Sequence, residues 1–183
     1  VFQLHHVLSS NTVLLWLQYA PRCRRSLPTR RSSVLKRLVD DTPKHVFMDI
    51  AKRIEKLGWH IVVYFEAPDL EELIPFLQTL PTIVVVDHMG RPDIANGVDH
   101  PDFKRFVDFM QANDNIWTKV SCPERLTVDG PPYDDVVPFA RLLVEKIPGR
   151  VLWGTDWPHP NMKSHFPDRS AARRVGTELR WRE

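Results

Sequence analysis

The sequence lacks the features that mark several large classes of protein. No apolar run approaches the ~18–20 residues of a membrane-spanning helix, so no association with a membrane is expected. The two cysteines, Cys23 and Cys122, cannot build a disulfide framework and form no Cys-x-x-Cys pair, which favours a reducing compartment. Glycine-rich phosphate loops of the Gly-x-Gly-x-x-Gly and P-loop types are absent, so nucleotide binding has no support. We expect no cofactor of another kind.

The positive charge of the chain is confined to its two ends. The 183 residues carry a formal net charge of +2 at pH 7, from 25 Lys and Arg against 23 Asp and Glu. Residues 1–39 contain seven basic side chains and no acidic one, and residues 169–183 contain five Arg and two Glu. The body between them is therefore acidic. A nucleic-acid-binding domain carries a basic stripe on its folded body, so nucleic acid is not an expected partner.

Residues 1–35 differ in composition from this acidic body. They are rich in Arg and Ser and free of acid, as a mitochondrial transit peptide would be, and they begin with Val1. We expect a divergent or non-native segment here and a cytoplasmic protein, with mitochondrial targeting as the alternative. The predicted organisation is this segment, a folded portion over residues 36–168, and a basic C-terminal tail over residues 169–183.

Helical and extended patterns alternate from Thr42 onward. Continuously apolar, β-branched runs of the kind buried in parallel sheets occur at residues 60–66, 82–88, 116–122 and 151–157. Each run is preceded by apolar residues at helical spacing, over residues 43–57, 68–80, 101–113 and 133–147. Pro75 is expected to kink or split the second helix, and the fourth also contains a proline, Pro138. This alternation predicts parallel strands joined by right-handed crossovers.

Polar side chains stand at the carboxyl end of every predicted strand. They are Tyr64 and Glu66, Asp87 and His88, Ser121 with Glu124 and Arg125 just beyond it, and Asp156. Chemistry spread over several strand ends is typical of a TIM-type barrel, whereas a doubly wound sheet concentrates it at one switch point. A full barrel needs eight strands and ~250 residues. We therefore predict an α/β fold that is the C-terminal half of a (β/α)8 barrel, with irregular tails and one further candidate strand at Val13–Trp16.

Several separated stretches also resemble a known family. They are VVYFEAPDLEEL, VVVDHMGRPD, KVSCPERL with GPPYDDVVPFA, and RVLWGTDWPHPNMK. In this order they resemble the 2-pyrone-4,6-dicarboxylate lactonases of the amidohydrolase superfamily, over roughly Lys36 to Asp168. The resemblance implies hydrolysis of a cyclic dicarboxylate lactone in the degradation of aromatic compounds, with that small molecule as the partner.

The resemblance implies roles for five residues of this chain. Asp156 corresponds to the aspartate that acts as general base toward water, and His88 to a histidine that binds and polarises the lactone carbonyl. Arg91 and Arg125 correspond to arginines that bind the carboxylates of the substrate, and Tyr64 to a tyrosine that hydrogen-bonds it. Guanidinium groups bind carboxylates bidentately, which suits a dicarboxylate.

The sequence departs from the superfamily pattern in one respect. The superfamily places a His-x-His pair on its first strand, whereas this chain has adjacent His5 and His6 and no His-x-His. Many superfamily relatives bind Zn²⁺ through those histidines, and His88 with Asp156 provides too few ligands, so we expect no metal. Two alternatives stay open: a metal-dependent amidohydrolase or decarboxylase of the same superfamily, and an inactive barrel fragment. The oligomeric state is not indicated.

Overall fold

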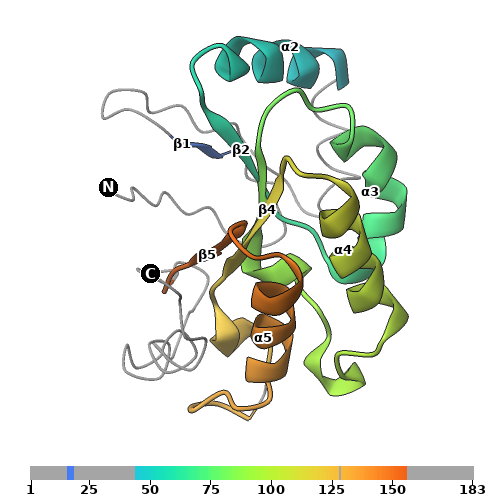
Figure 1. The fold of residues 1–183 in the computed structure, drawn as a ribbon, viewed down its shortest axis with the longest axis vertical. Coiled ribbons are helices and arrows are strands. Elements are labelled where there is room, and N and C mark those ends of the chain that lie inside the picture. The colour runs from blue at the N-terminus through green and yellow to red at the C-terminus, as the bar shows by residue number, and fades with distance from the viewer. Residues whose placement is uncertain (1–15, 19–43, 128, 156–183) are drawn as a thin grey trace.

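The structure is a computed structural model and describes residues 16–18, 44–127 and 129–155. Strands and helices alternate in the order β1 (Trp16–Gln18), α2 (Lys44–Glu55), β2 (His60–Val63), α3 (Leu70–Leu77), β3 (Val84–Val86), α4 (Pro101–Ala112), β4 (Ile116–Val120), α5 (Val137–Lys146) and β5 (Val151–Trp153) (Figure 1). Short 3-10 turns lie at Ala67–Asp69, Asp87–Gly90, Ile94–Asn96 and Pro123–Arg125. The predicted alternation from α2 onward is confirmed.

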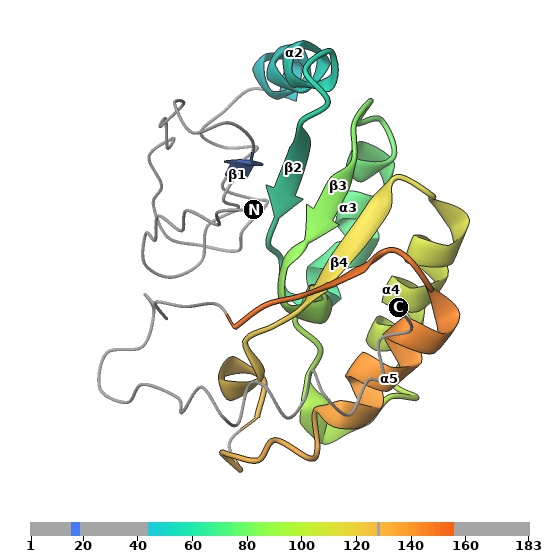
Figure 2. The same ribbon diagram turned by 60° about the vertical axis from the view of Figure 1, so that its left-hand side comes forward.

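The five strands form one sheet in the order β1-β2-β3-β4-β5. The pairs β2–β3, β3–β4 and β4–β5 are parallel, so each of these strands lies beside the one that precedes it in the chain. Helices α3, α4 and α5 lie on one side of these strands (Figures 1 and 2). This is the arrangement of a (β/α)8 barrel, because a doubly wound sheet reverses its strand order and has helices on both faces. The predicted partial barrel is confirmed.

The first strand differs from the prediction in position, and its direction was not predicted. The sequence favours a strand at Val13–Trp16, whereas β1 occupies Trp16–Gln18, and residues 13–15 lie outside the described ranges. β1 runs antiparallel to β2, with Gln18 opposite His60. Antiparallel pairing needs no crossover helix, so a three-residue segment can cover the hydrogen-bonding edge that β2 would otherwise present.

Helix α2 follows directly from apolar spacing and a glycine. Phe47, Ala51 and Ile54 recur at helical spacing and are buried. Gly58 then adopts a φ of 65°, and its N–H donates to the carbonyl of Glu55. Glycine takes this left-handed geometry at little cost, so it ends the helix where the sequence predicts.

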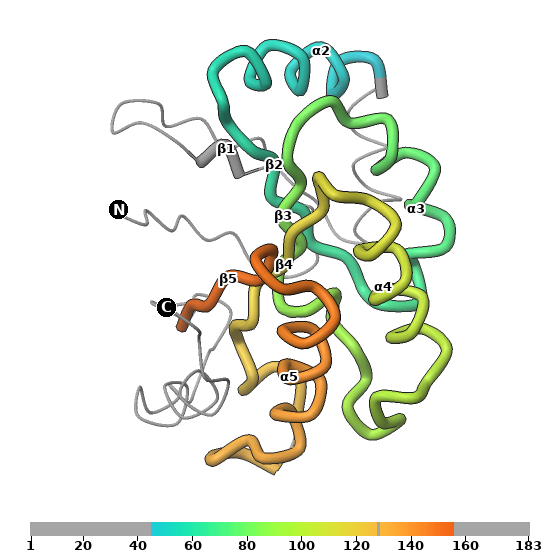
Figure 3. Tube along the Cα trace, in the orientation of Figure 1, coloured from blue at the N-terminus to red at the C-terminus, as the bar shows by residue number. Residues whose placement is uncertain are grey.

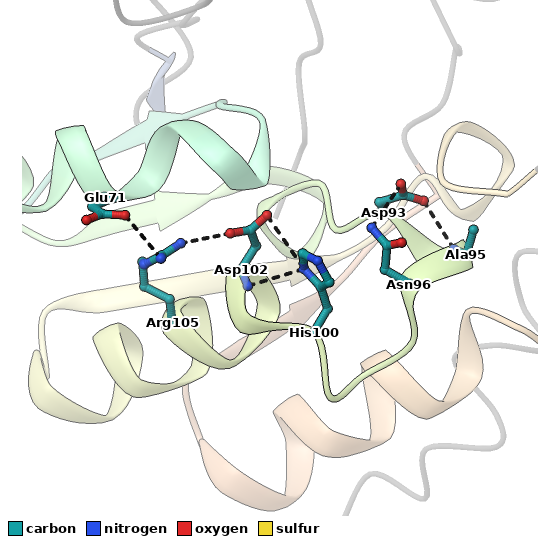
Figure 4. Close-up of polar contacts among 7 residues, drawn as sticks. All are labelled: Glu71, Asp93, Ala95, Asn96, His100, Asp102 and Arg105. Atoms are coloured by element: carbon teal, nitrogen blue, oxygen red, sulfur yellow. Dashed lines mark hydrogen bonds and ion pairs between the residues drawn. The ribbon is translucent and has the colours of Figure 1, made fainter.

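Helix α4 begins at a histidine cap. Nδ1 of His100 accepts the backbone N–H of Asp102 at 3.4 Å, and Pro101 occupies the first turn. Asp102 pairs with Arg105 at 2.8 Å, and Arg105 reaches Glu71 of α3 at 3.1 Å (Figure 4). These contacts fix the start of α4 and join it to α3.

Two helices begin later than predicted, and both contain a proline. The pattern favours helices from Pro68 and Tyr133, whereas α3 begins at Leu70, after a 3-10 turn, and α5 begins at Val137. The expected split at Pro75 does not occur, since α3 continues through it to Leu77, although proline cannot donate to the carbonyl of Glu71 one turn earlier. Pro138 falls in the first turn of α5, where proline is favoured.

The core lies between the helices and one face of the sheet. The rings of Phe65 and Phe106 are 6.2 Å apart, and those of Phe103 and Phe139 are 4.8 Å apart. The strand residues in this core are Ile61, Val63, Val84, Val86, Ile116, Val120 and Val151. Burying an apolar side chain of this size is worth about 1.5–3 kcal/mol, so packing against the helices holds the short strands in place. None of the helices within the described ranges has the length and apolarity to cross a membrane.

Strand pairing stops before the predicted strands do. The paired strands end at Val63, Val86, Val120 and Trp153. The polar residues after β2, β3 and β4 therefore lie in the turns that leave the sheet. Figure 3 shows the turns after β2, β3 and β4 leading toward α3, α4 and α5.

Candidate active site

Four of the five predicted site residues meet at the carboxyl end of the parallel strands. Tyr64 follows β2, His88 follows β3, and Arg125 lies in the 3-10 turn after β4. The ring centroids of Tyr64 and His88 are 5.9 Å apart. The guanidinium carbons of Arg91 and Arg125 lie 6.0 and 5.6 Å from the centroid of the Tyr64 ring. Three loops therefore meet around one phenol, and Asp156 lies just beyond the described residues.

His88 and Arg91 are carried by a left-handed turn. The φ angles are 51° at His88, 58° at Met89, 70° at Gly90 and 52° at Arg91. This region costs a residue with a side chain of order 1–3 kcal/mol, and it persists where surrounding packing enforces it. Met89 is buried, and a Cβ on Gly90 would lie 3.1 Å from the ring of Phe106. Because about three residues make one turn, the side chains of His88 and Arg91 leave the chain on the same side.

His88 is buried and held by a serine of the neighbouring loop. Its Nδ1 lies 2.9 Å from Oγ of Ser121, and both residues are buried. When Ser121 donates, the neutral imidazole carries its proton on Nε2, which is the tautomer that can donate to a carbonyl oxygen. The sequence marks Ser121 only as a polar strand-end residue. Its contact with His88 depends on the parallel register between β3 and β4.

Tyr64 is a buried phenol between two cations. Burial raises the pKa of Tyr64 to about 12, Arg91 opposes the rise, and Glu66 adds to it through its charge and its hydrogen bond. The phenol is therefore a neutral hydrogen-bonding group at physiological pH. Arg91 and Arg125 both lie within the ~6 Å at which a guanidinium is attracted to an aromatic face.

Glu66 joins Tyr64 to Arg91. Oη of Tyr64 donates to Oε1 of Glu66 at 2.8 Å, and Nε of Arg91 donates to Oε2 at 3.3 Å. Nη1 of Arg91 donates to the backbone carbonyl of Arg125 at 2.7 Å. The sequence places Glu66 at a strand end without indicating which arginine it contacts, and the structure shows that it is Arg91.

A buried ion pair near the site was not singled out by sequence reasoning. Nζ of Lys119 lies 2.9 Å from Oδ1 of Asp87, and both side chains are largely buried. Burial, and then the charge of Lys119, lower the pKa of His60. Side chains alternate along a strand, so Lys119 faces away from the core residue Val120. The signal in the sequence that could have indicated this ion pair is Lys119 itself, a charged residue inside the otherwise uncharged strand β4.

Metal-ligating side chains do not gather in the described part of the chain. Within residues 44–127 and 129–155, no three His, Cys, Asp or Glu side chains are placed to hold an ion. Cys122 is fully buried, and its thiol contacts Oε1 of Glu124 at 3.3 Å. His5, His6 and Asp156 lie outside the described ranges, so the expectation of a metal-free site stays a prediction.

Comparison with known proteins gives a family for the chain. The family model described as amidohydrolase matches residues 29–182. The chain is 61% identical over 146 residues to a 2-pyrone-4,6-dicarboxylate hydrolase of Comamonas testosteroni, a match that covers 75% of this chain and 48% of that protein. It is 41% identical over 104 residues to a 4-sulfomuconolactone hydrolase of Hydrogenophaga intermedia, covering 57% of this chain and 34% of that protein.

A solved structure shares the fold. It is a protein of Acinetobacter baumannii described as a probable 2-pyrone-4,6-dicarboxylic acid hydrolase with citric acid bound. The match has a TM-score of 0.60 at 27% identity and covers 76% of this chain and 51% of that one. The chain thus spans about half the length of the Comamonas relative and of this structure. With the family model matching most of its length and a parallel half-barrel carrying the expected strand-end residues, the chain belongs to the amidohydrolase family.

Proposed function

We propose that this chain carries the C-terminal part of a lactone hydrolase site that acts on a cyclic dicarboxylate of the 2-pyrone-4,6-dicarboxylate type. The observation that carries the proposal is the convergence of Arg91 and Arg125 on Tyr64, next to the buried His88. Two guanidinium groups in one site offer the charged, forked donors that carboxylates bind best. The names of the Comamonas and Hydrogenophaga relatives support lactone hydrolysis.

In the proposed reaction, Asp156 accepts a proton from water while the water oxygen forms a bond to the lactone carbonyl carbon. A positioned general base of this kind typically supplies about 10²–10⁴-fold in rate. His88 donates a hydrogen bond to the carbonyl oxygen, on which negative charge develops. The tetrahedral intermediate then breaks the ring C–O bond. The ring oxygen leaves as an enolate and takes up the proton that Asp156 accepted from water. The former lactone carbonyl becomes a carboxylic acid, which releases its proton to solvent and leaves as a carboxylate.

The charges of the site suit an anionic substrate. Arg91 and Arg125 bring two positive charges, and Glu66 offsets one of them, so this group has a net charge of +1. The Acinetobacter structure is described with citric acid bound, and citric acid is a tricarboxylate, so a protein of this fold does bind a molecule with several carboxylates. A cytoplasmic location is part of the proposal and rests on the low cysteine content.

The test is hydrolysis of 2-pyrone-4,6-dicarboxylate, followed by the loss of pyrone absorbance. It is run on this chain alone and on this chain joined to the N-terminal half of the Comamonas relative. We expect turnover in the joined protein and a loss of at least about 100-fold in Asp156→Asn, because an amide fills the same space but cannot accept the proton of water. Asp99→Asn is the matched control, since this side chain is 88% exposed and pairs with Lys104.

The outcomes separate the alternatives. Full activity in Asp156→Asn removes that residue as the base, and a folded but inactive joined protein overturns the proposal. Activity only in the joined protein supports the interpretation that the chain alone is an inactive barrel portion. Activity lost to a chelator and restored by Zn²⁺ supports the metal-dependent alternative.

A further inference from the structure

We propose that Glu66 is a positioning residue that holds Tyr64, Arg91 and Arg125 as one rigid anion-binding unit. The inference deepens the proposed function and rests on it for the identity of the anion. The role follows from a closed circuit of hydrogen bonds at the carboxyl end of the strands.

The circuit passes through four side chains and one backbone carbonyl. Nη2 of Arg125 donates to Oη of Tyr64 at 3.5 Å, and Oη donates to Oε1 of Glu66 at 2.8 Å. Oε2 of Glu66 accepts Nε of Arg91 at 3.3 Å, and Nη1 of Arg91 donates to the carbonyl of Arg125 at 2.7 Å. Both carboxylate oxygens of Glu66 are used, one for the phenol and one for the guanidinium. Glu66 is thus the residue that links Tyr64 to Arg91 within the circuit.

The circuit determines what each group can offer to a substrate. A phenol has one proton, and Tyr64 directs it to Glu66, so its oxygen can act toward a ligand only as an acceptor. An ionised dicarboxylate has no donor, so Tyr64 does not bind it through this proton while the circuit is closed. The contribution of Tyr64 is its ring, which lies beside the guanidinium groups of Arg91 and Arg125.

Arg91 is oriented by the same contacts. Its Nε is engaged by Glu66 and its Nη1 by the carbonyl of Arg125, whereas Nη2 has no hydrogen-bond partner among residues 44–127 and 129–155. Its side chain is 22% exposed. The guanidinium therefore presents its Nη2 end to an incoming carboxylate. Without Glu66 the side chain could rotate, because a single bond to a carbonyl does not fix the plane of a guanidinium.

Charge and position predict opposite effects when Glu66 is neutralised. Glu66→Gln raises the net charge of the unit from +1 to +2, which by itself strengthens binding of an anion. The same change removes the acceptor for Nε of Arg91 and frees its orientation. We therefore expect kcat to fall about tenfold or more in the joined protein while KM does not rise, since small misplacements cost large factors in rate. Glu66→Asp keeps the charge but is one methylene shorter and cannot span both partners, so its kcat should fall as well.

A second measurement needs no catalytic activity and uses this chain as it stands. Glu66 raises the pKa of Tyr64 by its charge and by accepting the phenolic proton. In Glu66→Gln the pKa of Tyr64 should therefore fall, and the tyrosinate absorbance should appear at lower pH than in the wild type. Tyr64→Phe identifies the signal among the three tyrosines of the chain. Glu71→Gln is the matched control, because that carboxylate is 75% exposed and its ion pair with Arg105 joins α3 to α4 and does not involve Tyr64.

The Tyr64 titration and the kinetics of the joined protein distinguish failure of the positioning role from failure of the proposed function. If Glu66→Gln lowers the pKa of Tyr64 but the wild-type joined protein hydrolyses no lactone, the positioning role stands and the proposed function is wrong. If the wild type is active and Glu66→Gln and Glu66→Asp keep its kcat and KM, the positioning role is overturned. An unchanged Tyr64 titration in a folded Glu66→Gln variant overturns it too. Should Glu66→Gln fail to fold, Glu66→Asp decides the question, since retained kcat would show that charge alone suffices.

Discussion

Replacing Gly90 by alanine tests the packing that holds the left-handed turn. The residue has a φ of 70°, and an added Cβ would lie 3.1–3.2 Å from three atoms of the Phe106 ring. Phe106 is itself buried against Phe65 and Phe103. Neither the turn nor the ring can yield without disturbing the core, so Gly90→Ala should lower the free energy of unfolding.

The size of the effect follows from two contributions. The left-handed conformation costs a residue with a Cβ roughly 1–2 kcal/mol, partly offset by about 0.4–1 kcal/mol from the stiffer unfolded chain. Overpacking a core typically costs a further 1–3 kcal/mol, so we expect about 2–4 kcal/mol for Gly90→Ala. Gly58→Ala is the matched control, because Gly58 has a φ of 65° but nothing within 4 Å of the added Cβ. It should show only the backbone part, about 1 kcal/mol.

The assay is urea unfolding followed by far-ultraviolet circular dichroism, with the wild type, both alanine variants and Gly90→Ala/Phe106→Leu. Residues in contact show coupling of about 0.5–3 kcal/mol, so the double variant should lose less stability than the two single changes together predict. Equal losses in Gly90→Ala and Gly58→Ala, with no coupling to Phe106, would falsify the claim that this ring fixes the turn.

Three further predictions concern charges in and near the site. Arg125→Met in the joined protein should raise KM about tenfold or more, because a charged hydrogen bond to the substrate is worth roughly 1.5–3 kcal/mol. The value of kcat should change little, since this bond is made in the ground state and the transition state alike. A lower kcat at unchanged KM would contradict this. The pKa of Tyr64 is raised from 10.0 to about 12, so its stabilising contribution should be complete below pH 10 and lost toward pH 12. At about 1.4 kcal/mol per unit this amounts to roughly 3 kcal/mol of unfolding free energy, and Tyr64→Phe should lack this part of the alkaline loss. Lys119→Met should raise the pKa of His60, observed by NMR titration of its ring protons, and an unchanged value would show that burial alone lowers it.

The alternation of elements and the strand-end chemistry could be predicted because both are local patterns. The runs around Val62, Val85 and Thr118 are short and apolar, and their flanking helices carry apolar residues at helical spacing. Parallel pairing in chain order then brings the strand ends together without further information. Tyr64 and His88 were therefore expected at one edge, and the structure places them there.

The contacts within the site could not be predicted, because they depend on backbone geometry that the sequence does not display. The left-handed turn contains only one glycine, and His88 and Met89 give no sign that they adopt positive φ. The link between Glu66 and Arg91 spans 25 residues and requires that turn. Lys119 was missed because a single lysine in a short strand usually faces solvent, whereas here Asp87 of the neighbouring loop neutralises it. The direction of β1 was not predicted, because three residues carry too little pattern to fix pairing.

The circuit through Glu66 also has a consequence for the order in which the chain folds. Its links join residues separated by 2, 25, 34 and 61 positions, so they reach across three strand-and-turn units. Closing a long loop lowers the entropy of the chain before the contact at its ends contributes any stabilisation. The circuit can therefore close only after β2, β3 and β4 have paired and their helices have docked. Substitutions at Glu66 or Arg91 should therefore accelerate unfolding while leaving the folding rate nearly unchanged. During folding, the sheet can be complete before Tyr64, Glu66, Arg91 and Arg125 form their hydrogen bonds.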